Sequence, residues 1–304
     1  MFFLRNSLLT LSCLVLICIL PDDSIGQTTD NNAGGTSVEL ASGEYRLQAR
    51  FFATDATGSP PTILMLGDLP GADVNKATAL GLARNLSDRG MNVLTFNYRG
   101  THGSNGVFTL SGVDQDIDAA RRWLRSENTT GRFDIDPDTI VMGGYGFGGG
   151  MALAYSSTDL AITDVFSIAG FDQSVGMGRY SRDPMHQEVL KNRLTRSSEN
   201  GESLVRWERG DFFAYVKEAL QGSGRWDLLL AAPQLARKRM LLVGGADDTE
   251  VGLEEHILPL YRILRGLGTQ DLKLIVYQDD HEFGEVSDQL TDALGTWIER
   301  VTDN

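Results

Sequence analysis

Apolar residues along most of the chain alternate between short runs and stripes at helical spacing. The runs predict buried strands at 45–53, 63–66, 93–96, 139–143, 165–168, 241–243 and 272–277. Between them, stripes such as Ala79, Leu82, Ala83 and Leu86 follow the i, i+3, i+4, i+7 pattern of a helix with one buried face. Similar stripes lie within 113–124, 257–264 and 290–301, and small residues predict a further helix over 148–155. This regular alternation predicts an α/β fold with a mostly parallel sheet of about eight strands and helices on both faces.

Residues 171–224 interrupt the alternation. The segment is rich in aromatic residues and methionine, among them Met177, Tyr180, Trp207 and Phe212, and it predicts a mostly helical insertion. Ligands of parallel α/β sheets bind beyond the carboxyl ends of the strands. We therefore expect 171–224 to form a helical cap over that edge of the sheet.

The first 26 residues have the pattern of an export signal. Arg5 precedes an apolar run from Leu8 to Leu20, and the small residues Ser24 and Gly26 fit cleavage after Gly26. The run is too short to span a bilayer comfortably, which favours a cleaved signal over an uncleaved anchor. The predicted location is therefore secreted or periplasmic, with no integral membrane span after cleavage.

The segment that follows the predicted signal, 27–37, is polar and glycine-rich. This composition is typical of a flexible leader. The folded domain is then expected to cover 38–304, with 171–224 as its insertion.

Charge and composition narrow the classes of partner and cofactor. The chain has 27 Lys and Arg against 41 Asp and Glu, a net charge of −14, which argues against nucleic acid and anionic membranes. Cys13 and Cys18 both lie in the predicted signal, so the mature chain would have neither a disulfide nor a thiol nucleophile. His186 and His256 have no partners at metal-ligand spacing, and the glycine run 143–150 lacks the Lys-Ser/Thr ending of a phosphate loop. No metal or cofactor is expected, and a small-molecule ligand or substrate stays unidentified.

One loop and the helix after it carry a family resemblance. Residues 96–108 read Phe-Asn-Tyr-Arg-Gly-Thr-His-Gly-Ser-Asn-Gly-Val-Phe, and a helix over 116–125 then ends in Trp-Leu-Arg. This pair resembles the Tyr-Arg-Gly loop and the following Asp…Leu-Arg helix of the α/β-hydrolase superfamily. The likeness is to the prolyl oligopeptidase-like and dienelactone hydrolase-like serine hydrolases. The resemblance implies an α/β-hydrolase fold with an esterase- or peptidase-like site, and it is silent on substrate.

In that family the nucleophile is a serine on a sharp turn between strand and helix, with the pattern G-x-S-x-G. The corresponding turn here reads Gly144-Tyr145-Gly146-Phe147-Gly148, so glycine stands at the nucleophile position. Gly146 has no side chain to attack a carbonyl, and it relaxes a backbone conformation that strains other residues. The resemblance therefore implies a serine-hydrolase fold without its serine. It does not decide whether the chain is an enzyme.

The resemblance places the acid and the imidazole in two later loops. The loop at 245–251 selects Asp248 by its register, with Asp247 as the alternative, and His281 follows the next predicted strand. The order 146, 248, 281 matches the Ser…Asp…His order of the family. We expect Asp248 and His281 to be hydrogen-bonded, with the imidazole facing the Cα of Gly146 across an empty space the size of a hydroxymethyl group.

The implied oxyanion hole consists of the backbone N–H groups of Leu69 and Phe147. Where the family usually has His-Gly before the first of these donors, this chain has Gly67-Asp68. A carboxylate at this place would oppose the negative charge that develops during acyl transfer. The oxyanion loop thus departs from the family pattern, as the nucleophile turn does.

Two functional hypotheses remain. The first is a non-catalytic protein that binds a small molecule or a partner in the former active-site cleft. The second is a hydrolase of ester, thioester or amide bonds that uses His281 and Asp248 with activated water or with an unorthodox nucleophile such as Ser104. Gly146 and Asp68 favour the first hypothesis.

Overall fold

An eight-stranded sheet forms the centre of the molecule. The computed structural model describes residues 34–70, 73–75, 80–130, 132–195, 204–222 and 224–303. The predicted export signal and the leader up to residue 33 lie outside this range. Among the described residues no helix combines the length and the apolar character that a membrane crossing requires.

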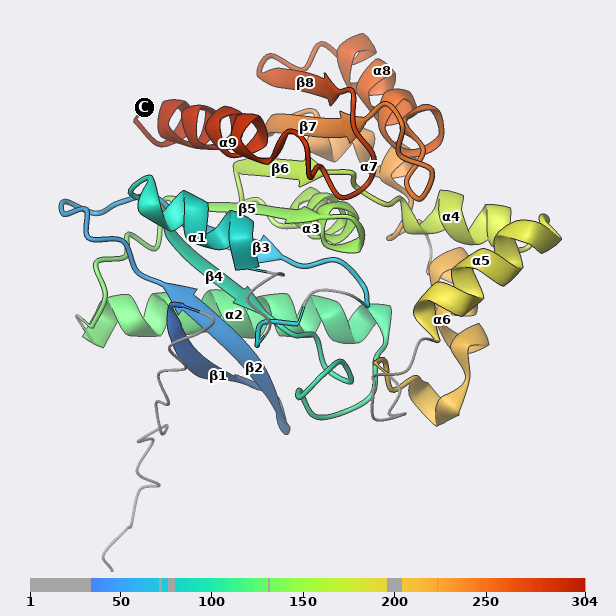
Figure 1. The fold of residues 1–304 in the computed structure, drawn as a ribbon, viewed down its shortest axis with the longest axis horizontal. Coiled ribbons are helices and arrows are strands. Elements are labelled where there is room, and N and C mark those ends of the chain that lie inside the picture. Colours follow the sequence, from blue (N-terminus) through green and yellow to red (C-terminus); the bar gives the residue numbers. More distant parts are fainter. Residues whose placement is uncertain are drawn as a thin grey trace, which may run out of the picture.

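The strands follow the order β1-β2-β4-β3-β5-β6-β7-β8 (Figure 1). The two pairs that involve β2 are antiparallel and every other pair is parallel, which confirms the predicted mostly parallel sheet. Strands β3, β4 and β6 are buried at every position, because helices cover both faces of the sheet. The strands are β1 (Thr36–Ser42), β2 (Tyr45–Phe52), β3 (Thr62–Leu66), β4 (Asn92–Phe96), β5 (Ile140–Tyr145), β6 (Asp164–Ile168), β7 (Arg239–Gly245) and β8 (Leu272–Tyr277).

Helices lie on both faces of the sheet. Figure 1 shows α1 and α9 together in front of it, whereas α2 and α3 lie behind it. On the rear face α3 packs against α7, and α7 packs against α8. The helices are α1 (Gly81–Asp88), α2 (Leu110–Thr130), α3 (Phe147–Thr158), α4 (Gln173–Tyr180), α5 (Pro184–Leu194), α6 (Phe212–Gln221), α7 (Leu228–Leu235), α8 (Leu258–Gly266) and α9 (Ser287–Thr302).

Two elements differ from the expectations drawn from the sequence. Strand β1 begins at Thr36, inside the segment expected to be a flexible leader, because Val38 and Leu40 are buried on one face while the strand pairs with β2. Helix α7 was not predicted at all. In its sequence, LLLAAPQL, the buried residues Leu228, Ala231, Ala232 and Leu235 have helical spacing, but the apolar Leu230 on the exposed face and the internal Pro233 obscure this stripe. Helix α7 packs against α3 and α8, which explains its apolar buried residues.

Helices α4, α5 and α6 form the insertion, which we call the cap. In Figure 1 they lie beyond the arrowheads of the parallel strands, the side on which the sequence predicts a cap. Backbone bridges join Thr101 to Val205 and Phe108 to Trp207, so the cap is attached to the loop before α2. The ring of Phe108 also contacts the rings of Trp207 and Tyr215.

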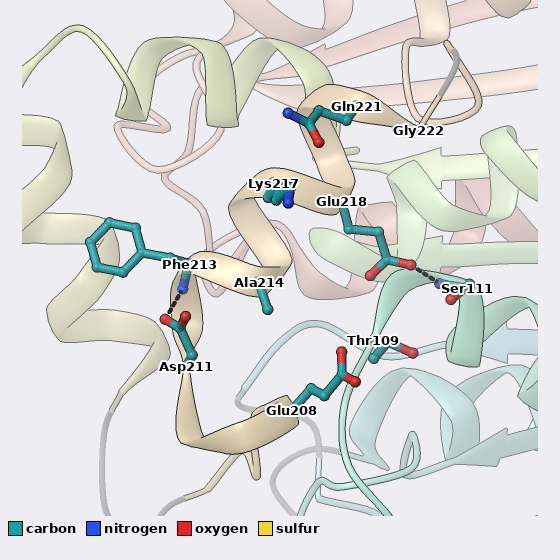
Figure 2. Close-up of a pocket in the computed structure, with 10 residues that line it drawn as sticks. All are labelled: Thr109, Ser111, Glu208, Asp211, Phe213, Ala214, Lys217, Glu218, Gln221 and Gly222. Carbon is teal, nitrogen blue, oxygen red and sulfur yellow. Dashed lines mark hydrogen bonds between the residues drawn. The ribbon is translucent and has the colours of Figure 1, made fainter.

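A carboxylate on α6 fixes the cap to the start of α2. The two oxygens of Glu218 accept the backbone N–H groups of Leu110 and Ser111, each at 2.7 Å. These donors have no partner within the helix, because the first turn of any helix leaves its N–H groups unpaired. Figure 2 shows Glu218 beside Ser111, on the wall of an open groove of about 610 Å³ between α6 and the start of α2.

Candidate functional site

The turn between β5 and α3 has the backbone conformation of a nucleophile turn. Gly146 adopts φ 55° and ψ −118°, which strains any residue with a Cβ. Its N–H donates to the carbonyl of Ile168 at 2.9 Å, and its own carbonyl accepts the N–H of Phe171 at 3.0 Å. Gly148 lies against the end of β3, where a Cβ would be only 2.2 Å from the carbonyl oxygen of Leu66. The glycines of this turn thus allow β3, β5 and α3 to approach one another closely.

The carboxylate of Asp68 fills the space in front of this turn. A Cβ built on Gly146 would lie 2.2 Å from Oδ1 of Asp68 and 2.5 Å from its Cγ. Oδ1 also accepts the backbone N–H of Phe147 at 2.7 Å. The expectation of an empty space beside Gly146 is therefore wrong. The N–H groups at the start of α3 attract an anion, and Asp68 is the anion that reaches them.

The same contact changes the expected oxyanion hole. Phe147 N–H is paired with Asp68, so it does not face open space as an oxyanion donor would. Leu69 is buried beside it, and both residues line a cavity of about 20 Å³. Tyr98 fixes the loop that carries Asp68, because its hydroxyl donates to the carbonyl of Gly67 at 2.8 Å.

Asp248 and His281 lie together, as the loop order leads one to expect. Nδ1 of His281 is 2.8 Å from Oδ2 of Asp248, whose side chain is fully buried. The other carboxylate oxygen of Asp248 accepts the N–H groups of Glu250 and Val251, each at 2.8 Å. Asp247, the alternative acid, is exposed and accepts a hydrogen bond from Gln278 instead. The geometry thus selects Asp248.

Three carboxylates surround the buried imidazole. Nε2 of His281 has no hydrogen-bond partner among the described residues, and it lies 3.7 Å from Oδ2 of Asp68 and 3.9 Å from Oε2 of Glu250. Burial lowers the pKa of His281, but the bond to Asp248 and the charge of Asp68 outweigh it and raise the pKa to about 10. The imidazole therefore carries a proton at neutral pH, and a protonated imidazole cannot act as a general base.

Arg193 of the cap completes this cluster. From α5 its guanidinium forms ion pairs with Asp68 and with Glu250, and its side chain is 18% exposed. Burial alone would raise the pKa of Asp68, but Arg193, His281 and the N–H of Phe147 together lower it below its usual value. Asp68 is thus a carboxylate held by two cations and a helix N-terminus. No sequence pattern marked Arg193, because it lies 125 positions from Asp68 in the chain.

The space between the cap and Gly146 is almost closed. The cavity of about 20 Å³ lies between Asp68 and Phe147 on the sheet side and Leu190, Arg193 and Tyr215 on the cap side. This volume is enough for about one water molecule. The arrangement leaves no room for an acyl substrate beneath the cap.

A larger cavity of about 330 Å³ lies on the other side of Asp68. It is bounded by β3, the first residues of α1 and the first residues of α9. Asp68, Tyr145 and Glu282 contribute polar groups to its wall. Asp68 thus stands between the closed space under the cap and this open one.

The other candidate residues have structural contacts. Ser104, the alternative nucleophile, is fully buried; its hydroxyl donates to the carbonyl of Asn97 at 2.8 Å and accepts the N–H of Gln48 at 2.9 Å. His256 accepts the N–H of Asp172 and stacks on Phe171. Over the described part of the chain, no group of three or more His, Cys, Asp and Glu side chains is arranged to hold a metal ion.

The loop that carries the family resemblance is buttressed by a buried ion pair. The guanidinium of Arg99 donates twice to Oδ1 of Asp116, at 2.7 and 2.9 Å, and the backbone N–H of Arg99 donates to Oδ2. Ser42 of β1 bonds to both partners. The motif thus fixes the loop that supports Gly67 and Asp68 through Tyr98, and it contributes no group that faces His281 among the contacts of the described residues.

Comparison with solved structures identifies the fold. An esterase from Pyrococcus furiosus superposes with a TM-score of 0.63 at 17% identity, over 92% of this chain and 97% of the esterase. Est1E from Butyrivibrio proteoclasticus gives 0.63 at 14% identity, over 89% and 100% of the two chains. The α/β hydrolase GrgF from a Penicillium species gives 0.62 at 16% identity, over 88% and 99%. The chain therefore has the α/β-hydrolase fold, as the sequence predicts.

Comparison of sequences gives a match to part of the chain. No protein-family model matches the chain. An uncharacterised protein of Mycobacterium tuberculosis is 32% identical over 108 residues. That match spans 36% of this chain and 36% of the length of the relative.

Proposed function

We propose that this chain is an α/β-hydrolase-fold protein in which glycine has replaced the nucleophile serine, and that it acts by binding a ligand rather than by hydrolysis. The observation that carries the proposal is the place of the Asp68 carboxylate. It takes both spaces that acyl transfer needs, the one beside Gly146 and the one in front of the Phe147 N–H. A tetrahedral intermediate would need that N–H for its oxyanion.

Three features of the site are each expected to slow acyl transfer: the missing serine, the paired N–H of Phe147 and the charge on His281. Loss of the serine from a comparable triad costs about six orders of magnitude in rate. The paired N–H of Phe147 removes one oxyanion donor, worth about 10²–10³ in rate. The charge on His281 removes the general base. A chain with all three changes is expected to hydrolyse esters no faster than a protein surface does.

A second candidate function is favoured by one contact. Oδ2 of Asp68 lies 3.7 Å from Nε2 of His281, whose Nδ1 is oriented by Asp248, so a carboxylate stands where the serine hydroxyl of a triad would stand. Asp68 would then attack the carbonyl carbon of an ester, thioester or amide that enters from the larger cavity. The alcohol, thiol or amine would leave with a proton from His281, and water would hydrolyse the resulting mixed anhydride to release the acid and restore Asp68. The pairing of Asp68 with Arg193 and with the Phe147 N–H weakens it as a nucleophile, which is why binding is preferred.

The deciding experiment measures hydrolysis and covalent labelling together. We expect wild-type protein to leave a fluorophosphonate probe unreacted and to cleave p-nitrophenyl acetate and butyrate at the rate of the His281→Ala variant. A wild-type rate at least tenfold above that of His281→Ala, and of Asp68→Asn, would establish the second candidate. Labelling of any serine in the wild type would reveal an unrecognised nucleophile and overturn the proposal.

Export is part of the same proposal, supported by the pattern of the first 26 residues. The full chain would be expressed in a Gram-negative bacterial host and the cells fractionated. The mature protein is expected in the periplasm or medium, with Gln27 as its first residue by N-terminal sequencing. Protein that keeps Met1 and stays with the cytoplasmic fraction would contradict export and leave the binding proposal untouched.

A further inference from the structure

We propose that the cavity of about 330 Å³ bounded by β3, α1 and α9 binds a small organic ammonium ion with an aromatic or branched apolar body. This inference rests on the proposed binding function and names the class of ligand. It concerns the side of Asp68 that faces away from the cap, which the serine-hydrolase comparison leaves unused.

The size and wall of the cavity fit a small apolar body. Its volume lies at the lower end of the range of about 300–1,000 Å³ usual for ligand pockets. Half of the described lining residues have apolar side chains: Met65, Leu66, Val74, Leu80, Leu82, Phe283 and Leu290. Ligand pockets commonly combine such a wall with a few placed polar groups.

The charges on the wall select a cation. Asp68 and Glu282 both line the cavity, and no Lys, Arg or His is among the lining residues that the structure describes. Arg193 reaches Asp68, but it lines the small cavity on the cap side and leaves the charge of Glu282 uncompensated on this side. Because Arg193 and His281 already neutralise Asp68, Glu282 is the charge that distinguishes ligands: it would repel a carboxylate and attract an ammonium ion.

The aromatic side of the cavity adds a second preference for an ammonium group. The rings of Tyr145 and Phe283 both line it and contact each other at 6.1 Å between centroids, nearly perpendicular. A cation held near such rings gains from their negative faces.

Binding would be measured by ligand-observed NMR and calorimetry on the full chain at pH 7. The probes are benzylamine, which is protonated at this pH, benzyl alcohol and benzoate. They share an aromatic body and differ in charge. We expect benzylamine to bind with a Kd of about 1 mM or tighter, at least tenfold tighter than either of the other two.

A pair of glycine variants locates the site. A Cβ on Gly81, at the start of α1 in the cavity wall, would meet no atom within 4 Å, so Gly81→Leu is expected to fill the cavity and weaken benzylamine binding at least tenfold. Gly266 on α8 is equally open and remote from the cavity, so Gly266→Leu is the matched control and should bind as the wild type does. Glu282→Gln should weaken binding several-fold.

Three results would overturn the inference: no benzylamine binding, equal binding of benzoate or benzyl alcohol, or unchanged binding in Gly81→Leu. Failure here is distinguishable from failure of the proposed function. If the wild type proves to be a His281-dependent hydrolase while benzylamine binding still responds to Gly81→Leu, only the non-catalytic role is wrong. If the wild type neither hydrolyses esters nor binds benzylamine, only the ligand class is wrong.

Discussion

Oδ1 of Asp68 lies 2.2 Å from the position that a Cβ on residue 146 would occupy. This distance is far below any van der Waals contact, so a side chain at 146 and the present position of Asp68 exclude each other. The carboxylate is in turn held by Phe147 N–H at 2.7 Å and by Arg193. The glycine of the turn and the aspartate of the neighbouring loop therefore act as one structural unit.

The first prediction concerns the rescue of a nucleophile. Gly146→Ser alone should not react with a fluorophosphonate probe, because Asp68 must move before the serine fits and Phe147 N–H stays paired. Gly146→Ser combined with Asp68→Gly should react, since it frees both the space and the N–H donor. Labelling would be followed by in-gel fluorescence and located by mass spectrometry.

The same pair of variants has a measurable cost in stability. Serine at 146 must adopt φ near 55°, which strains a residue with a Cβ by about 1–3 kcal/mol. The single variant must displace Asp68 and the double variant loses the Asp68–Arg193 ion pair, so both should be less stable than the wild type in urea denaturation. If the single variant labels as fast as the double variant, Asp68 does not block the site and the exclusion argued above is wrong.

A second prediction concerns the ion pair between the cap and the core. Arg193→Met leaves Asp68 without its arginine in a nearly closed space, and it should lower the free energy of unfolding by about 2–4 kcal/mol. Hydrogen exchange of α5 should speed up in the same variant. Arg179→Met is the matched control, because Arg179 pairs with Glu255 in a contact that is 44% exposed on both sides and should be worth less than about 1 kcal/mol. Equal losses in the two variants would mean that Asp68 does not depend on Arg193.

The third prediction follows from the raised pKa of His281. Because the folded-state pKa is about 10 and the ordinary value is 6.5, the charged imidazole stabilises the fold fully below about pH 6.5 and loses this contribution as the pH rises through about 10. The stability advantage of wild type over His281→Gln should therefore fall between these limits, by at most about 1.4 kcal/mol per pH unit. Urea denaturation at a series of pH values measures it. Titration of the His281 ring near pH 6.5 in NMR spectra would show that the surrounding carboxylates do not hold its proton.

The sequence predicts the sheet and the order of the site loops well, for a physical reason. Strands such as Ile63–Leu66 and Val165–Ile168 are buried on both faces, so nearly every residue is apolar and the run is visible. The elements that escaped prediction lack such a signal. In helix α7 the exposed Leu230 and the internal Pro233 obscure the buried stripe, and β1 begins in a polar stretch whose alternation is short.

The chemistry of the site was predictable only in part. Gly146, Asp248 and His281 stand in local patterns that can be read along the chain. The carboxylate of Asp68 occupies the space beside Gly146 because it is bonded to Phe147 and Arg193. These residues lie 79 and 125 positions from it in the chain. Asp68 was expected to oppose an oxyanion, and the structure shows it in the place of the missing side chain instead. Such pairings across the fold leave no spacing pattern in a single sequence.

The last prediction concerns the attachment of the cap through Glu218. Its carboxylate accepts the N–H groups of Leu110 and Ser111, each at 2.7 Å, and the N-terminus of α2 favours a negative charge there. Glu218→Ala should therefore lower the free energy of unfolding by about 1–2 kcal/mol and increase hydrogen exchange at the first turn of α2 and along α6. Glu218→Gln, which keeps one acceptor and removes the charge, should fall between Ala and wild type.

A matched control stands in the same groove. Glu208 lines it beside Thr109 but is exposed, and it accepts no hydrogen bond from the start of α2 among the contacts that the structure describes (Figure 2). Glu208→Ala should change stability by less than about 0.5 kcal/mol, since isolated surface substitutions seldom do more. If Glu208→Ala and Glu218→Ala cost the same, the groove responds to net charge alone. If exchange in α2 rises only in Glu218→Ala, the two hydrogen bonds hold the cap in place.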